Sequence, residues 1–277
     1  MATYYIATTG NDSTGNGSSG TPWATFAKFL ASSASGDTCV ARAGTYTWTT
    51  ATLTNRNLQN YTGETVIFDG AGAQFAWTHS GTVAITGVAF QNAIGNSSSF
   101  DCAGTTTTFA NCSFSNVSND GVGYNGGLFR IYGASASLTL TNCVFNDIKH
   151  YASGGNAGKL ISGGSNAQTV AITGCTFYTS ATGTSQLSYI VTAWAANVNL
   201  TIKNCIFYNA TGGTITWGSN GNGGSVVTTA TYSDFYLITS NPTGTGVITS
   251  SPLFVDAASS NFRLRPTSPC LNTGSAV

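Results

Sequence analysis

The chain has 277 residues, and its nine Lys and Arg residues balance nine Asp and Glu residues, so its formal net charge is zero. Charged residues make up only 6% of the chain, against about 25% in an ordinary soluble domain, whereas apolar residues reach 41%. This composition excludes disorder, which goes with low hydrophobicity and high net charge, nucleic-acid binding, which needs clustered Lys and Arg, and a membrane span, which needs an apolar run of about 18 residues.

The N-terminal stretch predicts a cap. Thr21 and Pro22 are residue types typical of a helix N-cap and first turn. Four apolar residues after them share one helical face: Trp23, Phe26, Ala27 and Leu30. We therefore expect an amphipathic helix of about three turns across the first coil of the fold. Residues 1–6 lack the basic and apolar regions of a secretory signal, so we expect either a replaced signal or release by lysis.

A repeat occupies the middle of the chain. Its copies alternate apolar and polar residues and end in Phe, at residues 83–90, 107–114, 138–145, 170–177 and 200–207. Weaker copies end at Phe68 and Phe235, and the successive Phe-to-Phe spacings from 68 to 235 are 22, 24, 31, 32, 30 and 28. These spacings are too long for a hexapeptide solenoid and too irregular for a propeller.

Each copy contains a residue that tolerates left-handed backbone, at Gly87, Asn111, Asn142, Gly174 and Asn204. One such residue between two short strands bends the chain without a loop. Two positions before each Phe, and therefore on its side of the strand, is a smaller residue: Val88, Cys112, Cys143, Cys175 and Cys205. The order of strand, bend, strand, longer loop and strand, about every 30 residues, predicts an all-β fold, a right-handed parallel β-helix with Phe and Cys ladders inside.

The seven cysteines predict buried free thiols. Four of them occupy one ladder position where Val88 and Ser233 also occur, which indicates packing of small residues and not a set of crosslinks. No close pair of Cys or His has the spacing of a metal site. The states of Cys39, Cys102 and Cys270 stay open at this point.

Motifs at both ends resemble the pectate-lyase-like right-handed parallel β-helix superfamily. They are residues 4–12 (YYIATTGND), 20–26 (GTPWATF), 36–46 (GDTCVARAGTY), 251–256 (SPLFVD), 261–264 (NFRL) and 268–274 (SPCLNTG). The resemblance implies a single β-helix domain over 1–277, with a cap and first coil at 1–46, further coils at 47–250 and a closing segment at 251–277. It does not select a function, since the superfamily includes lyases, glycoside hydrolases, phage tailspikes, adhesins and virion proteins.

Enzymes of the resembled superfamily place their active sites on the outer face of one sheet and in the loops beside it. Six charged or titratable residues gather within 40 positions, in or after the predicted loops: Asp120, Arg130, Asp147, Lys149, His150 and Lys159. As a polysaccharide lyase site, this cluster would use Lys159 as base and Arg130 as stabiliser, with His150 and Lys149 as further candidates. Asp120 and Asp147 would lie near a calcium ion. The alternative is that these are solvated loop charges, paired between coils for less than about 1 kcal/mol.

A second candidate site is aromatic. Five large rings occupy or border a stretch without charges: Tyr178, Tyr189, Trp194, Tyr208 and Trp217. Tyr178 and Tyr208 each follow a ladder Phe, so they should point outward and stack on the surface. Such a row suits sugar rings. The alternative is that longer loops or a neighbouring subunit cover these rings, and the resemblance implies that the subunit interface could be that of a homotrimer. His79 and His150 have no partner in local sequence and are expected at the surface or in loops.

Together these features favour a non-catalytic, virion-associated or cell-surface structural protein, such as a phage capsid decoration or accessory protein, with glycan binding as an option. Such a protein would need no cofactor and would meet other virion or surface proteins on the virion surface or outside the cell. The alternative is a secreted polysaccharide lyase or glycoside hydrolase acting on acidic polysaccharide, with calcium if it is a lyase. Ice binding is a third option, because Thr is abundant, but the uneven spacing of 22 to 32 residues does not promise a flat regular array.

Overall fold

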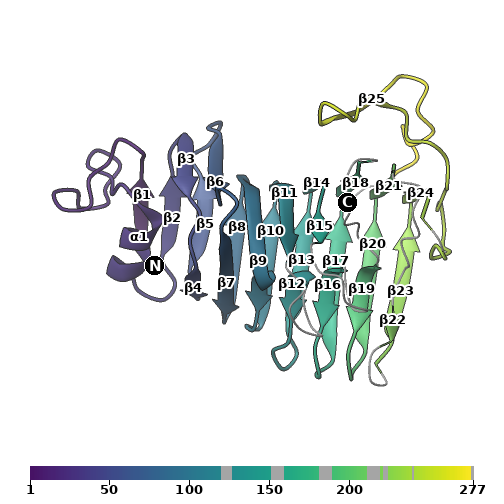
Figure 1. Cartoon of the computed structure of the whole chain (residues 1–277), viewed down its shortest axis with the longest axis horizontal. Coiled ribbons are helices and arrows are strands. Elements are labelled where there is room, and N and C mark those ends of the chain that lie inside the picture. Colours follow the sequence, from purple (N-terminus) through teal and green to yellow (C-terminus); the bar gives the residue numbers. More distant parts are fainter. Residues whose placement is uncertain are drawn as a thin grey trace.

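The computed structural model describes residues 1–119, 127–150, 159–180, 189–210, 219–220, 224–238 and 240–275. The chain folds into a right-handed parallel β-helix, as the repeat predicted, and Figure 1 shows its coils side by side along the long axis. The short helix α1 lies at the N-terminal end, and the closing segment lies at the other end. The described part contains no helix long and apolar enough to cross a membrane.

Every complete coil has three faces. The first face is one continuous sheet of β1 (Thr3–Ile6), β2 (Thr38–Ala41), β5 (Asn57–Asn60), β8 (Thr82–Thr86), β10 (Thr106–Ala110), β13 (Ser137–Thr141), β17 (Gln168–Thr173), β20 (Val198–Lys203) and β23 (Val226–Thr231). The second face contains β3 (Gly44–Thr47), β6 (Val66–Asp69), the first part of β9 (Val88–Cys102), β11 (Ser113–Asn119), β14 (Val144–Asn146), β18 (Thr176–Thr179), β21 (Ile206–Asn209) and β24 (Asp234–Tyr236).

The third face contains β4 (Ala51–Thr54), β7 (Gln74–Ser80), the second part of β9, β12 (Gly127–Ile131), β16 (Lys159–Gly163), β19 (Tyr189–Ala193) and β22 (Ser219–Asn220). The long strand β9 runs through both the second and the third face and joins them into one sheet. A two-residue strand, β15 (Lys149–His150), pairs with the end of β11.

The corner between the first and second faces is a single residue, as the sequence predicted. The five residues expected in left-handed backbone all adopt it, with φ of 70° at Gly87, 53° at Asn111, 52° at Asn142, 65° at Gly174 and 54° at Asn204. Tyr232 takes the same conformation in the next coil, with φ of 50°, although bulky residues rarely do so. Because the corner residue repeats in the six coils from Gly87 to Tyr232, the two faces stay in register along this part of the helix.

The predicted Phe ladder forms the core. Phe145, Phe177 and Phe207 stack with ring centroids 4.4 and 4.3 Å apart and nearly parallel planes. Phe114 continues the stack at 4.7 Å from Phe145, and Phe235 at 5.0 Å from Phe207. All five rings are nearly inaccessible to solvent, so each coil buries a large apolar side chain against its two neighbours.

The prediction of buried free thiols is confirmed for the four ladder cysteines. Cys39, Cys102 and Cys270, whose states the sequence left open, are also free, and of the seven only Cys270 is partly exposed. The ladder thiols also do more than fill space. The backbone N–H of Cys143 donates to Sγ of Cys175 at 3.3 Å, and that of Cys175 donates to Sγ of Cys205 at 3.4 Å. In the next coil, the N–H of Cys205 donates to Oγ of Ser233 at 3.1 Å. A hydroxyl therefore replaces a thiol here because both groups accept this bond.

The N-terminal helix differs from the prediction. Helix α1 spans Phe26–Ser32, and Thr25 is its N-cap, whose side chain accepts from the N–H of Lys28 at 3.1 Å. The expected N-cap at Thr21 and length of about three turns are wrong. Trp23 instead forms a β-bridge with Ile6, and the Asp12 carboxylate accepts from the N–H groups of Ala24 and Thr25. These contacts keep the residues up to Ala24 out of the helix.

His79 is also placed differently from the prediction, which expected a surface or loop residue. Its side chain is fully buried, with ring centroids 5.9 Å from Phe100 and 5.8 Å from Phe109. Neither ring nitrogen has a hydrogen-bond partner in the described part of the chain. Burial lowers the pKa of His79 to about 3, so the ring is neutral at pH 7. His79 is two positions after the buried Trp77 on β7, so both side chains project from the same, inner side of the strand.

The closing segment turns back over the second face. Its strands β25 (Phe254–Asp256) and β26 (Asn261–Leu264) form an antiparallel pair. The Asn204 side chain holds the end of the segment, donating to the Ser275 carbonyl at 2.8 Å and accepting from the Ser275 N–H at 3.0 Å. Asn146 donates to Oγ of Ser260 at 2.7 Å. Two coils are thus tied to one terminal segment.

Candidate functional site

The charged residue Arg130 projects outward from β12 and pairs with the preceding coil. Its Nη2 lies 2.6 Å from Oδ2 of Asp101, its register partner on β9. Its guanidinium carbon lies 4.6 Å from the ring centroid of Tyr132. The hydroxyl of Ser98 donates to the other oxygen of Asp101. Both carboxylate oxygens are therefore engaged, and the group joins two coils.

Lys159 does not join this group. It begins β16, only 4% exposed, on the same side of the strand as the fully buried Ile161. The register partner of Arg130 on β16 is Ser162, three positions after Lys159, so Lys159 and Arg130 project from opposite sides of the sheet. Burial lowers the pKa of Lys159. The described structure does not bring the predicted base and stabiliser together.

The predicted calcium ligands are not brought together either. Asp147 adopts left-handed backbone, with φ of 53°, and its Oδ1 accepts from the Ser180 N–H at 2.7 Å. Asp120 lies outside the described residues, as do the side chains of Lys149 and His150, whose backbone forms β15. Among the described residues, no three His, Cys, Asp or Glu side chains gather as a metal site would require.

The tyrosine row exists, but it is covered. Tyr178 and Tyr208 project outward from the second face, with ring centroids 5.3 Å apart, as predicted. Phe262 of the closing segment lies 5.3 Å from Tyr178, and Phe254 lies 6.0 Å from Tyr208. Tyr178 is only 8% exposed as a result. The structure therefore agrees with the alternative that further chain covers these rings: Tyr178 is buried under the C-terminal residues, and Tyr208 is half-buried.

The other predicted aromatic residues lie elsewhere. Trp194 is half-buried and follows β19, so it belongs to the corner between the third and first faces. The side chain of Tyr189 and all of Trp217 lie outside the described part. The five rings therefore do not form one described platform.

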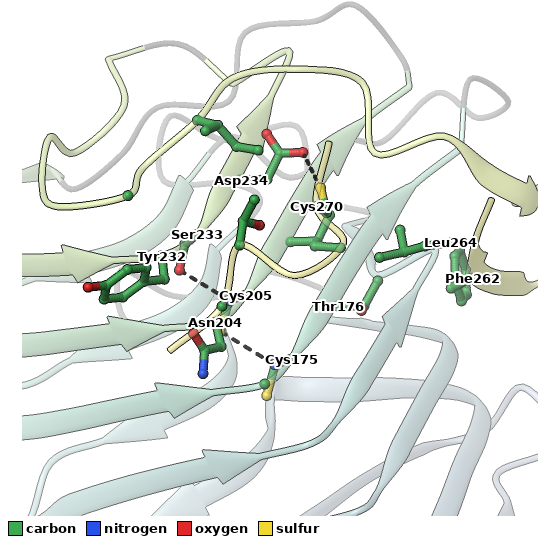
Figure 2. Close-up of a pocket in the computed structure, with 16 residues that line it drawn as sticks. Cys175, Thr176, Asn204, Cys205, Tyr232, Ser233, Asp234, Phe262, Leu264 and Cys270 are labelled. Atoms are coloured by element: carbon green, nitrogen blue, oxygen red, sulfur yellow. Dashed lines mark hydrogen bonds between the residues drawn. The ribbon is translucent and has the colours of Figure 1, made fainter. Parts of the chain in front are cut away.

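A cavity of about 270 Å³ lies between the closing segment and the outer surface of the second face (Figure 2). Thr176, Ile206 and Asp234 line it from three successive strands, and Phe262 and Cys270 line it from the closing segment. No sequence pattern pointed to this cavity, because Asp234 and Cys270 lie 36 positions apart with no shared periodicity.

Asp234 and Cys270 form a buried polar pair in this cavity. Sγ of Cys270 lies 3.2 Å from Oδ2 of Asp234, as Figure 2 shows. Asp234 is 2% exposed, and its Oδ1 has no hydrogen-bond partner among the described residues. Burial raises the pKa of Asp234 to about 6, and burial together with this carboxylate raises the pKa of Cys270 to about 12. The thiol therefore stays protonated at pH 7 and donates to the carboxylate, which is unsuited to nucleophilic chemistry.

A second cavity, of about 390 Å³, lies at the N-terminal end between α1 and β3. Its lining combines threonine side chains with aromatic rings, among them Thr8, Thr45, Phe26, Tyr46 and Trp77. None of the described residues that line this cavity is charged. Its chemistry is that of an apolar pocket with hydroxyls at the edge.

No protein-family model and no curated protein matches the chain. Solved structures do match. A pectate lyase, Pel9A, is 15% identical over 100% of this chain and 92% of its own, with a TM-score of 0.40. The pectin methylesterase PemA from Erwinia chrysanthemi is 11% identical over 99% and 98%, with a TM-score of 0.40.

A mannuronic acid specific polysaccharide family 6 lyase from human gut microbiota is 12% identical over 90% of this chain and 58% of its own, with a TM-score of 0.47. At such low identities the likeness is one of fold alone. What these proteins and this chain have in common is the right-handed parallel β-helix.

Proposed function

We propose that this chain is a non-catalytic structural β-helix protein that works outside the cell, on the surface of a virion or of a cell. One observation carries the proposal: the charged side chains that a polysaccharide lyase site would use are instead engaged in contacts within the fold or face its interior. Arg130 joins two coils through Asp101, Asp147 holds the N–H of Ser180, and Lys159 faces inward beside Ile161. Groups held in this way stabilise a scaffold and are not positioned around a substrate.

The ladders support the same proposal, because they make the molecule stiff. Stacked Phe rings and Cys-to-backbone hydrogen bonds repeat from coil to coil, and the closing segment ties the last coils together. A stiff rod of this kind suits a decoration or accessory role among other virion or surface proteins, as a monomer or a homotrimer. It would need no cofactor. If it binds glycans, Trp194 is a better candidate than the tyrosine row, because Tyr178 is buried and Phe254 lies beside Tyr208.

An activity assay tests the proposal. The purified chain is incubated with pectate or alginate and calcium, and the absorbance of unsaturated product is followed. We expect no product. Product that disappears with Lys159→Ala, but persists with Lys28→Ala as a matched control, would overturn the proposal in favour of a polysaccharide lyase. Circular dichroism of both variants shows whether each keeps its fold, since Lys159 is buried.

Location is tested separately by mass spectrometry. Purified virions and washed cell-surface fractions are compared with the culture supernatant. We expect the chain in near-stoichiometric amounts with a capsid or surface protein. Recovery only as a free protein in the supernatant would contradict the surface role.

A further inference from the structure

The outer surface of the first face carries a regular array of small hydroxyl-bearing side chains. Across the six strands β8, β10, β13, β17, β20 and β23, the outward positions form three columns that run from coil to coil. The columns are Thr82, Thr106, Ser137, Thr169, Asn199 and Val227; Ala84, Thr108, Thr139, Ala171, Thr201 and Thr229; and Thr86, Ala110, Thr141, Thr173, Lys203 and Thr231. We call these 18 residues the threonine face. None of them is buried.

The array is periodic in two directions. The pairings between these six strands run residue to residue, and none shows a shift of register. Neighbouring strands lie about 4.8 Å apart, and alternate residues along a strand lie about 6.6 Å apart. The threonine face therefore measures about 24 Å by about 13 Å. The uneven spacing of the repeats, which did not promise a regular array, leaves the register of this face undisturbed, because the extra residues lie mostly between the second and third faces.

Threonine is concentrated on this face beyond what composition or strand preference explains. Thr occupies 11 of the 18 positions, although only 44 of the 277 residues are Thr. The second face offers a comparison within the same molecule. The equivalent outward positions from β9 to β24 are Ala89, Gln91, Ser113, Ser115, Val144, Asn146, Thr176, Tyr178, Ile206, Tyr208, Asp234 and Tyr236, with a single Thr. A preference of β-strands for Thr would act on both faces alike.

The chemistry of the array suits a neutral, hydrogen-bonding and ordered partner. Each Thr presents a methyl group and a hydroxyl that both donates and accepts, and its β-branched side chain is stiff at χ1. The hydroxyls are therefore held nearly fixed before anything binds, which lowers the entropy cost of ordering water on them. Lys203 is the one charged member, and no aromatic ring stands among the 18 residues. The face therefore lacks the flat aromatic surfaces on which sugar rings stack well.

We propose that the threonine face binds ice. Ice is a periodic lattice of hydrogen-bonded water, so a rigid two-dimensional repeat of hydroxyls and methyls can hold many lattice waters at once. Liquid water has no such repeat, and the face therefore favours the crystal over the liquid. This inference goes beyond the structural role proposed above and does not depend on it. A crystalline polysaccharide is the rival partner, and the experiment separates the two.

The test is growth of ice in the presence of the full-length chain. We expect the chain to inhibit ice recrystallisation and to enter a growing ice hemisphere when it carries a fluorescent label. Thr139→Tyr, in the middle column, puts a large ring into the array and should raise the concentration needed for inhibition by about tenfold or more. Ser115→Tyr, the matched control on the second face, should leave the concentration unchanged.

Two further variants separate the two parts of the Thr side chain. Thr139→Val keeps the shape and removes the hydroxyl, and Thr139→Ser keeps the hydroxyl and removes the methyl. We expect both to inhibit less well than the wild type and better than Thr139→Tyr. The inference fails if the folded wild type leaves ice growth unchanged, or if Thr139→Tyr and Ser115→Tyr behave alike. It also fails if the chain sediments with crystalline cellulose or chitin above the freezing point and Thr139→Tyr abolishes that binding alone.

Discussion

At the scale of single residues, a polar atom inside a coil needs a partner on the same or the next coil. The ladder thiols meet this need: Sγ of Cys143 contacts the Thr141 carbonyl at 3.4 Å, and its N–H donates to Cys175. His79 does not meet it, because neither ring nitrogen has a hydrogen-bond partner among the described residues. A buried ring without partners is stable only while it stays neutral.

His79 therefore predicts acid sensitivity. Its pKa is about 3 in the folded chain, against 6.5 for the ordinary side chain. Between these pH values the unfolded chain binds a proton that the folded chain does not, so stability falls as the pH falls, by about 3 kcal/mol at pH 4. His79→Leu should remove this loss. The check is the free energy of unfolding in urea at pH 7 and pH 4, for the wild type and the variant.

Asp234 acts in the opposite direction, because burial raises its pKa to about 6. Its folded form binds a proton between about pH 4 and pH 6 that the unfolded form lacks, and this stabilises the folded chain at acid pH. Asp234 is present in both the wild type and His79→Leu, so its contribution cancels when the pH dependence of their free energies of unfolding is compared. If the wild type and His79→Leu lose the same free energy between pH 7 and pH 4, the interpretation of His79 is wrong.

At the scale of elements, the one-residue corner between the first and second faces sets the geometry of the coil. Three of the described corners use Asn and two use Gly at φ between 52° and 70°. Asn142 also donates to Oδ1 of Asn111 at 3.4 Å, which links successive corners. Both residue types adopt left-handed backbone at low cost, whereas Ala does not.

Asn142 provides the test of this corner. Asn142→Ala should lower the free energy of unfolding by about 1–2 kcal/mol, because Ala lacks the short polar side chain whose local hydrogen bonds let Asn adopt left-handed backbone at low cost. Asn142→Gly should cost less, because Gly87 and Gly174 already serve at the same position. Thermal unfolding of the two variants beside the wild type makes the comparison. Equal losses for Ala and Gly would show that the lost side-chain hydrogen bond, and not the backbone, decides the cost.

The closing segment is the second element with a testable role. Phe262→Ala should expose Tyr178 and lower stability by about 2 kcal/mol, since part of a large apolar contact is lost. Nitration of Tyr178 by tetranitromethane, located by peptide mass, measures the exposure. Leu271→Ala is the control, because Leu271 belongs to the same segment and is already 38% exposed. Nitration of Tyr178 at the same rate in the wild type and Phe262→Ala would contradict the covering role.

These elements differ in how far sequence could predict them. The corners and ladders follow from local alternation, so Asn142 and Phe145 were placed correctly from their neighbours alone. The cover over Tyr178 depends on Phe262, 84 positions later, and no periodicity connects the two. The choice of Thr25 over Thr21 as N-cap depends on the Asp12 carboxylate, which a local pattern does not reveal.

The candidate site was harder to predict for a related reason. Lys159 and Arg130 lie near each other in the sequence, but the side of the sheet that each one faces depends on the register of β12 and β16. An offset of three positions sends the two side chains to opposite sides. The sequence also did not reveal the threonine face. The Phe-to-Phe spacing spans a whole coil, including the variable segment between the second and third faces, and therefore hides the constant register of the first face.

At the scale of the whole molecule, charge contributes little to the fold. Within the described residues, ion pairs join Arg42 to Glu64 and Arg130 to Asp101, all four side chains being in contact with solvent. We therefore expect the free energy of unfolding to change by less than about 1 kcal/mol between about 0.05 and about 0.5 M NaCl. Urea titrations at the two salt concentrations provide the measurement. A change of several kcal/mol would show that charges outside the described ion pairs stabilise the coils.

The corner between the second and third faces has a consequence for how this molecule can change. In the coil of β9 the chain passes this corner within one continuous strand, whereas in later coils further residues stand between β11 and β12, or between β18 and β19. The first face keeps its register across all of these coils. Foreign peptides inserted at this corner would thus be displayed in rows about 4.8 Å apart, as on a grafting scaffold, without disturbing the opposite surface.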